Sequence, residues 1–140
     1  MYKSKMMIVM RRDLKMRKGK IAAQAGHACI EAILMALKKE DRMNDFQIMP
    51  DGMFLKDMGK QNTPLSDWFE YGCAKVCVYV DSEGALLDIA KKAEEKGIIA
   101  AVIIDAGMTE FHGIPTKTCL ALEPLQSDVA DELTGDLPLY

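Results

Sequence analysis

Apolar runs and helical patterns alternate along the chain. The run Met6–Met10 is apolar throughout and lies between charged residues, which is typical of a buried strand. From Lys20 to about Leu37, apolar side chains recur at spacings of three and four, which predicts a helix with one buried stripe. The residues of this stripe are Ile21, Ala25, Ala28, Ala32 and Met35. Small residues dominate the first half of the helix, so we expect it to lie close against a sheet.

Three more strands and two helices follow in the second half of the chain. The predicted strands are Lys75–Val80, a stretch within Ile98–Ile104, and Thr118–Leu122. Ser82 is placed to cap a helix that runs to about Lys96 and ends at Gly97. Pro124 stops the last strand, and Ser127 is expected to cap a short helix to about Leu133. This order predicts an α/β fold with right-handed crossovers and a sheet that is at least partly parallel, with helices on its faces.

Residues 38–64 show no clear periodicity. Pro50, Asp51 and Gly52 form a turn signal, and Met53–Leu55 is either a short strand or an anchoring turn. Thr63 and Pro64 have the residue types of a helix N-cap and first position, which predicts a short helix up to Tyr71. An aperiodic excursion of this length in a compact domain is usually functional or mobile.

Charge is distributed unevenly, although the whole chain of 140 residues carries a formal net charge of only −3. The length fits a single domain, residues 1–140. The net charge argues against a protein that coats nucleic acid nonspecifically, but a local basic patch can still attract a phosphate. One such patch lies near the start of the chain and contains a single acidic residue, Asp13. Its basic residues are Lys3, Lys5, Arg11, Arg12, Lys15, Arg17, Lys18 and Lys20. The patch is either a phosphate-binding surface or a solvated, solubilising one.

The four cysteines are scattered and form no metal-binding spacing. Cys73 and Cys77 lie four positions apart without a histidine to complete a zinc site, and Cys29 stands alone. Cys77 and Cys119 lie in apolar runs and are expected to be buried, reduced thiols, as in a cytoplasmic protein. The apolar run Met6–Met10 is too short for a signal-peptide core or a membrane span, so we expect a protein without a membrane partner.

Ligands of open α/β sheets gather beyond the carboxyl ends of the strands, and two loops are expected there. One is the basic loop Arg11–Gly19, whose last glycine precedes a helix N-terminus that favours an anion. The other is the segment 105–117, where Thr109 and Thr116, together with Thr118 directly after the segment, bring hydroxyls near Asp105. These groups either position a water molecule or only form hydrogen bonds within the loop.

Helical spacing places Lys20, Gln24 and His27 on one side of the first helix, and Glu31 continues that side. This side is either part of a site or the solvated face of an amphipathic helix. The chain contains neither a P-loop nor a Gly-x-Ser-x-Gly motif. The residues alone therefore predict a phosphate-bearing ligand in an α/β cleft, and they leave open whether it is hydrolysed.

Three blocks in the same order resemble the type 2, archaeal and eukaryotic-type, peptidyl-tRNA hydrolases. They are "RRDLKMRKGKIAAQAGHA", "AVIIDAGMTEFHGIPTKTCLAL" and "DELTGDLPLY", and "KVCVYVDSEGALLDIAKKAEEKG" is similar to the middle of the family. The resemblance implies a three-layer α/β/α sandwich on a four-stranded mixed sheet, and a homodimer. It implies hydrolysis of the ester between a peptide and the 3′-terminal ribose of tRNA, which recycles the tRNA for translation. It implies peptidyl-tRNA as the partner, with no metal, no organic cofactor and no DNA.

The resemblance also assigns site residues. The family's catalytic residues fall on Lys20, Asp105, Thr109 and Thr118, and its helix glutamine and histidine fall on Gln24 and His27. With the basic loop and the neighbouring hydroxyl, the residues expected to bind tRNA are Arg12, Lys15, Arg17, Lys18, Gln24, His27 and Thr116. We expect Asp105 to orient or deprotonate a water molecule. We expect Lys20 either to stabilise charge on the ester oxygen or to bind the terminal phosphate.

The chain departs from the family pattern in three places. Arg17 stands where the family usually has glycine, and the loop "FHGIPT" is one residue longer than the common form. Residues 38–64 look like an insertion, which would be a lid, a dimer contact or a loose loop. Two other classes of protein compete with the esterase. One is a noncatalytic tRNA- or RNA-binding protein of the same fold, and the other is a small-molecule enzyme or nucleotide-binding domain.

Overall fold

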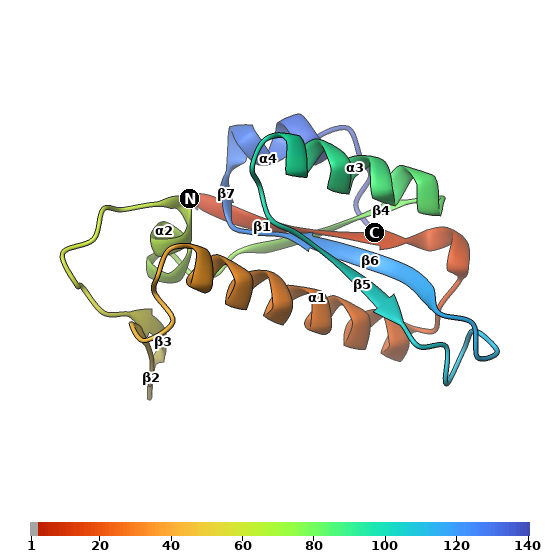
Figure 1. The fold of residues 1–140 in the computed structure, drawn as a ribbon, viewed down its shortest axis with the longest axis horizontal. Coiled ribbons are helices and arrows are strands. Elements are labelled where there is room, and N and C mark those ends of the chain that lie inside the picture. Colours follow the sequence, from red (N-terminus) through yellow and green to blue (C-terminus); the bar gives the residue numbers. More distant parts are fainter. Residues whose placement is uncertain (1–2) are drawn as a thin grey trace.

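A mixed β-sheet forms the middle layer of the computed structural model, which describes residues 3–140 (Figure 1). Its four long strands are β1 (Ser4–Arg11), β4 (Lys75–Val80), β5 (Ala100–Asp105) and β6 (Thr116–Leu122), in the order β4-β1-β6-β5. β1 runs parallel to β4, whereas β6 is antiparallel to both of its neighbours, β1 and β5. β1, β4 and β5 therefore all point the same way, and their carboxyl ends share one edge of the sheet.

The sheet has a fifth strand that the prediction of four strands lacked. This strand, β7 (Leu125–Gln126), is two residues long and pairs with Ser4 and Lys5 at the start of β1. Two residues are too few to produce a periodic signal, so the pattern of apolar positions could not reveal it.

Helices cover both faces of the sheet, as the three-layer prediction required (Figure 1). α1 (Lys18–Lys39) packs on one face, where its alanines meet the inward side chains of β1, β5 and β6. α3 (Glu83–Glu95) and α4 (Ser127–Thr134) cover the other face and enclose a second apolar cluster. Burial of apolar side chains on both faces explains why the central strands are apolar almost throughout.

α1 differs from its prediction in two ways. It begins at Lys18, with Arg17 as N-cap, so Gly19 lies inside its first turn and does not precede the helix. The buried stripe contains Gln24, Ala28, Ala32 and Ala36, whereas Met35 is exposed. The polar Gln24 thus occupies a core-facing position, which a pattern of apolar residues alone does not predict.

The predicted helix ends are mostly confirmed. Thr63 forms a capping box with Ser66 at the start of α2 (Pro64–Glu70), and Ser82 caps α3 by accepting a hydrogen bond from the N–H of Ala85. Gly97 follows α3 with φ +71°, the left-handed conformation that glycine adopts freely. The prediction for α4 was wrong by one residue, because Gln126 is its N-cap and Ser127 its first residue.

Residues 38–64 are an ordered excursion from the end of α1. β2 (Phe46–Met49) and β3 (Gly52–Leu55) pair as a hairpin around the predicted turn at Pro50 and Asp51. The buried guanidinium of Arg42 bonds to Glu40 and to the carbonyl of Gln61, which ties the two ends of the excursion together.

Candidate active site

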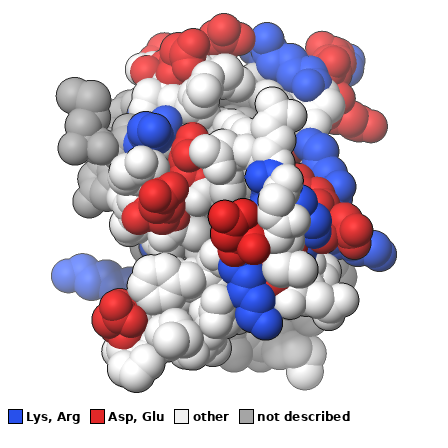
Figure 2. Space-filling model, turned by 90° about the vertical axis from the view of Figure 1, so that its left-hand side faces the viewer, with Lys and Arg blue, Asp and Glu red and all other residues white. Residues whose placement is uncertain are grey.

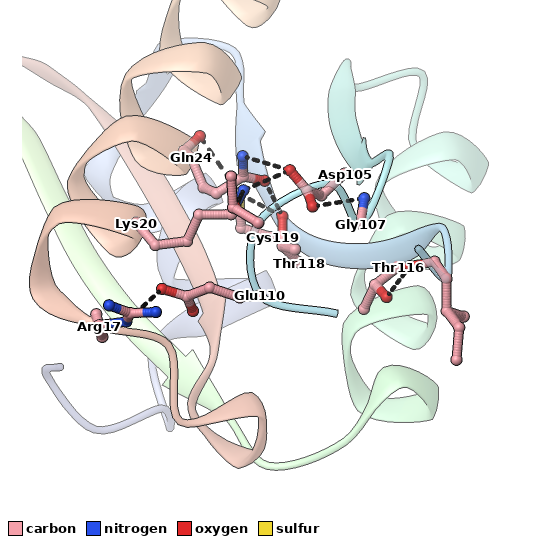
Figure 3. Close-up of polar contacts among 11 residues, drawn as sticks. Arg17, Lys20, Gln24, Asp105, Gly107, Glu110, Thr116, Thr118 and Cys119 are labelled. Atoms are coloured by element: carbon pink, nitrogen blue, oxygen red, sulfur yellow. Dashed lines mark hydrogen bonds and ion pairs between the residues drawn. The ribbon is translucent and has the colours of Figure 1, made fainter. Parts of the chain in front are cut away.

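The ammonium of Lys20 and the carboxylate of Asp105 form an ion pair at the edge where β1 and β5 end. Lys20 Nζ lies 2.6 Å from Asp105 Oδ1 and 3.1 Å from Thr109 Oγ1. Lys20 projects from the first turns of α1, and Asp105 is the last residue of β5 (Figure 3). Thr109 lies in the loop that follows β5. The fold thus brings three of the four predicted catalytic side chains into direct contact.

Asp105 is held by donors on both of its oxygens. Gln24 Nε2 lies 3.4 Å from Oδ1, and the N–H of Gly107 donates to Oδ2 at 2.9 Å. The hydrogen bond from Lys20 is the largest cause that lowers the pKa of Asp105 below its ordinary value. Partial desolvation opposes it, and the N–H of Gly107 lowers the pKa further. The carboxylate is therefore ionised at neutral pH and is a weak base.

Gly107 occupies a position in this loop where the structure demands glycine. Its φ is +82°, and a Cβ atom there would lie 2.5 Å from the carbonyl oxygen of Ile114. Any side chain would clash with backbone as well as strain the left-handed conformation. The loop therefore closes tightly enough to aim the N–H of Gly107 at Asp105.

Thr118 reaches the site through an irregularity in the sheet. Ile103 pairs with Cys119 and Ile104 pairs with Lys117, so Thr118 is an extra residue in β6, a β-bulge. The bulge lets Thr118 and Cys119 both face α1, where the Thr118 hydroxyl donates to Gln24 Oε1 (Figure 3). This bond orients the Gln24 amide so that its NH₂ faces Asp105. Simple alternation along a strand would have sent Thr118 to the opposite face.

The loop after Asp105 adds two side chains that sequence reasoning missed. Glu110 pairs with Arg17 Nε at 3.2 Å, and the ring of Phe111 lies 5.9 Å from Lys20 Nζ. Glu110 is largely buried and Arg17 largely exposed, so this pair joins the loop to the start of α1 without burying the guanidinium. Glu110 and Phe111 both lie in the block "AVIIDAGMTEFHGIPTKTCLAL", but no rule of residue spacing distinguishes them from ordinary loop residues.

Two predicted site residues do not reach the Lys20–Asp105 pair. His27 is exposed on the outer part of α1, one turn beyond Gln24. The hydroxyl of Thr116 donates to the carbonyl of Ile114, a hydrogen bond within its own loop. Of the two alternatives for these hydroxyls, Thr116 therefore shows the second, a hydrogen bond within the loop.

The basic loop divides into paired and unpaired cations. Arg11 pairs with Asp13, and Arg12 makes a two-pronged contact with Asp81. Within the described residues 3–140, Lys15 and Lys18 form no ion pair and are exposed. These two ammonium groups are the ones most available to an outside anion.

The cysteines supply no nucleophile. All four are free, and Cys119 lies fully buried beneath Gln24. Burial raises the pKa of Cys119 to about 11, which keeps it a neutral thiol. The prediction of a buried thiol is confirmed for Cys119, whereas Cys77 is half-buried.

Comparison with known proteins identifies the family. The model of the PTH2 peptidyl-tRNA hydrolases matches residues 4–140. The chain belongs to this family. A peptidyl-tRNA hydrolase of Methanocaldococcus jannaschii is 38% identical over 135 residues, which cover 96% of this chain and 98% of that protein. One of Pyrobaculum aerophilum is 36% identical over 137 residues, 97% of each chain.

A eukaryotic relative and a solved structure extend the comparison. The probable peptidyl-tRNA hydrolase 2 of Drosophila melanogaster is 37% identical over 135 residues, 96% of this chain and 61% of that protein. A solved Agrobacterium protein of unknown function shares the fold, with a TM-score of 0.51 and 12% identity over 100% of this chain and 99% of that one. Within this PTH2 chain, the Lys20–Asp105 pair is the candidate centre for the chemistry of the family.

Proposed function

We propose that Lys20, Asp105, Thr109 and Thr118 carry out the reaction of the family, hydrolysis of the ester that joins a peptide to the terminal ribose of tRNA. The observation that supports this most directly is the contact between Lys20 and Asp105 across two distant parts of the chain. Both side chains are mostly buried, at 15% and 13% exposure, so their charges act in surroundings poorer in water than the open surface.

Unused hydrogen-bonding capacity suggests how water and ester would be held. Lys20 Nζ has three N–H donors, of which Asp105 and Thr109 accept two. The third is available to an ester oxygen as negative charge develops on it. Asp105 Oδ2 accepts only from Gly107 among the described residues, so it can also accept a hydrogen bond from an attacking water.

The reaction then follows from this placement. The water oxygen bonds to the ester carbonyl carbon, and the bond from that carbon to the ribose oxygen breaks. One water proton ends on the ribose oxygen and the hydroxyl stays on the peptide as its carboxylic acid. Because the pKa of Asp105 is lowered, its main role is to orient the water rather than to remove a proton in a separate step.

tRNA would approach over the basic loop. Lys15 and Lys18 are exposed beside the start of α1, and phosphate contacts of this kind position RNA without reading its sequence. Sequence-independent contacts suit an enzyme whose substrates share the ester and not the anticodon. Arg17 can also bind a phosphate if that phosphate displaces Glu110, because the Arg17 side of the Arg17–Glu110 ion pair is exposed to solvent.

We also propose that the chain forms a homodimer through the outer face of α1. Between Lys20 and Lys38 only Glu31 is charged, and α1 is long and apolar enough by composition to cross a membrane. Yet only 28% of its most apolar stretch is buried within the chain. Ile30 and Leu34 are 64% and 47% exposed, an unusual face for a helix in water.

A second copy fits this face because the protruding side chains of Ile30 and Leu34 form part of the wall of a groove. The groove, of about 300 Å³, is lined almost entirely by apolar atoms of α1, α2 and the hairpin, among them Ile33, Leu37 and Trp68. In a two-fold dimer, Ile30 and Leu34 of each chain can enter the groove of the other. Figure 2 shows the hairpin end of the molecule, where uncharged surface makes up most of the lower part of the face.

We propose that the protein acts in the cytoplasm, where free thiols stay reduced and where translation supplies the substrate. All four cysteines are free, which suits that compartment.

Release of tRNA from peptidyl-tRNA tests the catalytic proposal. The wild type should release it, and Asp105→Asn, which keeps the shape but removes the charge, should lose at least about a hundredfold in kcat. Asp88→Asn is a matched control, because Asp88 pairs with Lys92 on the exposed side of α3. Absence of release by the wild type would favour the noncatalytic RNA-binding alternative.

A further inference from the structure

A compact cluster of aromatic and guanidinium groups lies at the carboxyl end of β4. The Arg12 guanidinium stacks on the Tyr79 ring, with 3.9 Å between its carbon and the ring centroid. Tyr140 packs edge-on against Tyr79, with 5.6 Å between ring centroids. We call Arg12, Tyr79 and Tyr140 the aromatic platform.

The platform is held rigidly. The N–H of Tyr140 donates to the carbonyl of Cys77, and Leu139 forms a bridge with Val78, so the last residues add to the edge of β4. Arg12 bonds to both oxygens of Asp81 and donates to the Tyr79 hydroxyl at 2.8 Å. Since the fork of the guanidinium is already occupied, Arg12 is poorly placed to bind a phosphate in the two-pronged way.

Two of these groups remain well exposed to solvent. The Arg12 side chain is 50% exposed and Tyr140 is 45% exposed, although its backbone is tied to the sheet. A flat cation beside an exposed aromatic ring is the arrangement on which unpaired nucleobases stack. Solubility does not require an exposed tyrosine fixed beside a stacked arginine.

The platform also lies on the same side of the sheet as the catalytic pair. Cys77 faces the α1 layer, and Tyr79, two residues later, faces the same way. β4 and β5 are separated by three strand spacings, about 14 Å. The first turn of α1, with exposed Lys18, follows the basic loop between them. A stacked single strand rising about 3.4 Å per nucleotide would cover this distance in about four nucleotides.

We propose that the aromatic platform binds an unpaired nucleobase of the single-stranded 3′ end of tRNA, upstream of the ribose that carries the ester. This inference rests on the proposed function, because it takes the Lys20–Asp105 pair as the place of the ester. It changes the role of Arg12 from a phosphate ligand to a stacking surface. Lys15, close to Arg12 in the loop, would bind the neighbouring phosphate.

Two substrates separate this site from the catalytic one. For peptidyl-tRNA, Tyr140→Ala should raise KM about tenfold and change kcat little, since stacking on one aromatic ring has an effect of this order. For an N-acylaminoacyl ester of adenosine alone, which has no upstream nucleotide, the same variant should leave KM unchanged. Tyr71→Ala is the matched control, because Tyr71 is 40% exposed and has Lys3 over its ring.

Fluorescence gives a readout that does not depend on turnover. An RNA hairpin with a single-stranded 3′ tail would carry 2-aminopurine, whose emission falls on stacking, at one tail position at a time. Wild-type protein and Tyr140→Phe should quench one position about three to four nucleotides from the end. Tyr140→Ala should not quench it, and Arg12→Lys, which keeps the charge but loses the plane, should quench it less.

Three results would contradict the proposal that the aromatic platform binds a nucleobase. They are an equal loss on both substrates with Tyr140→Ala, unchanged KM on both, and quenching that persists in Tyr140→Ala. Circular dichroism of Tyr140→Ala would detect a folding defect. Arg12→Lys tests the platform independently of Tyr140. Failure of the wild type to hydrolyse either ester would instead contradict the proposed function.

Discussion

Lys20 Nζ lies 2.6 Å from Asp105 Oδ1, although 85 positions separate the two residues in the chain. One residue comes from the first turns of α1 and the other from the end of β5, and β6 separates β5 from β1 in the sheet. Their meeting is the relationship on which the proposed chemistry depends.

Replacement of Lys20 by alanine should lower kcat by about 10² to 10³ and change KM little. The ammonium is placed to stabilise negative charge that exists only in the transition state. Steady-state release assays would measure both constants. Lys96→Ala is a suitable control, because Lys96 pairs with Glu132 between α3 and α4. A rise in KM at unchanged kcat would instead assign Lys20 to phosphate binding.

The pH dependence of stability should reveal the lowered pKa of Asp105. Because the folded-state pKa lies below the ordinary value of 3.8, the unfolded chain binds more protons between the two pKa values. The stabilisation is therefore fully present above the ordinary value and is lost as the pH falls through the folded pKa. Urea unfolding from neutral pH to below 3.8 would measure it.

In that experiment, the wild type should lose more stability on acidification than Asp105→Asn, which has no carboxylate to protonate. NMR titration of the Asp105 carboxyl carbon should show its pKa move upward in Lys20→Gln, since the largest cause of the lowering is removed. An unchanged titration in Lys20→Gln would contradict the contact.

Replacement of Thr118 by valine should reduce both stability and activity. The buried Gln24 Oε1 would lose its donor, at a cost of about 1–3 kcal/mol, and the amide would no longer be fixed toward Asp105. Urea denaturation and kcat would measure the two effects. Thr118→Ser keeps the hydroxyl and should retain most of the activity, so equal losses in both variants would argue against this role.

Salt should weaken tRNA binding, and the exposed lysines of the basic loop should account for part of the effect. Each phosphate contact contributes about −0.7 to −0.9 to the slope of log K against log salt concentration. Lys15→Ala and Lys18→Ala should each make the slope shallower by about one such contribution. Lys92→Ala, on the exposed side of α3, should leave it unchanged.

Charge on the outer face of α1 should prevent self-association. Ile30→Asp and Leu34→Glu would place a carboxylate in an apolar contact, where an unpaired charge is costly. Analytical ultracentrifugation should show a dimer for the wild type and a monomer for each variant, with folded spectra in all cases. A wild-type monomer at micromolar concentration would contradict the proposed dimer.

Much of the fold could be predicted from the sequence because its signals are local. Apolar runs mark β1 and β4, the spacing of alanines marks α1, and Thr63 and Ser82 cap their helices as their residue types indicate. The two-residue strand β7 and the exposure of Met35 could not be predicted, since they depend on which surfaces meet.

The candidate site likewise has features that local sequence signals predict and features that depend on tertiary contacts. Residue types and family resemblance predicted Lys20, Asp105, Thr109 and Thr118 as site residues, but not how Thr118 comes to lie beside Gln24. The bulge that turns Thr118 toward Gln24 depends on the pairing of β5 with β6, and pairing is a property of two strands together. The same holds for Glu110, which matters only because α1 begins beside it.

The four long strands, the main helices, the positive charge of the first loop and the family could all be inferred from the sequence. Which charges face each other depends on how the layers of the fold pack. In the folded chain, Asp105 pairs with Lys20. Arg12 forms hydrogen bonds with Asp81 and Tyr79, whereas Lys15 and Lys18 remain exposed. The physical reason is range: propensity and periodicity act over one or two turns of chain, whereas contacts between charges depend on the packing of whole layers.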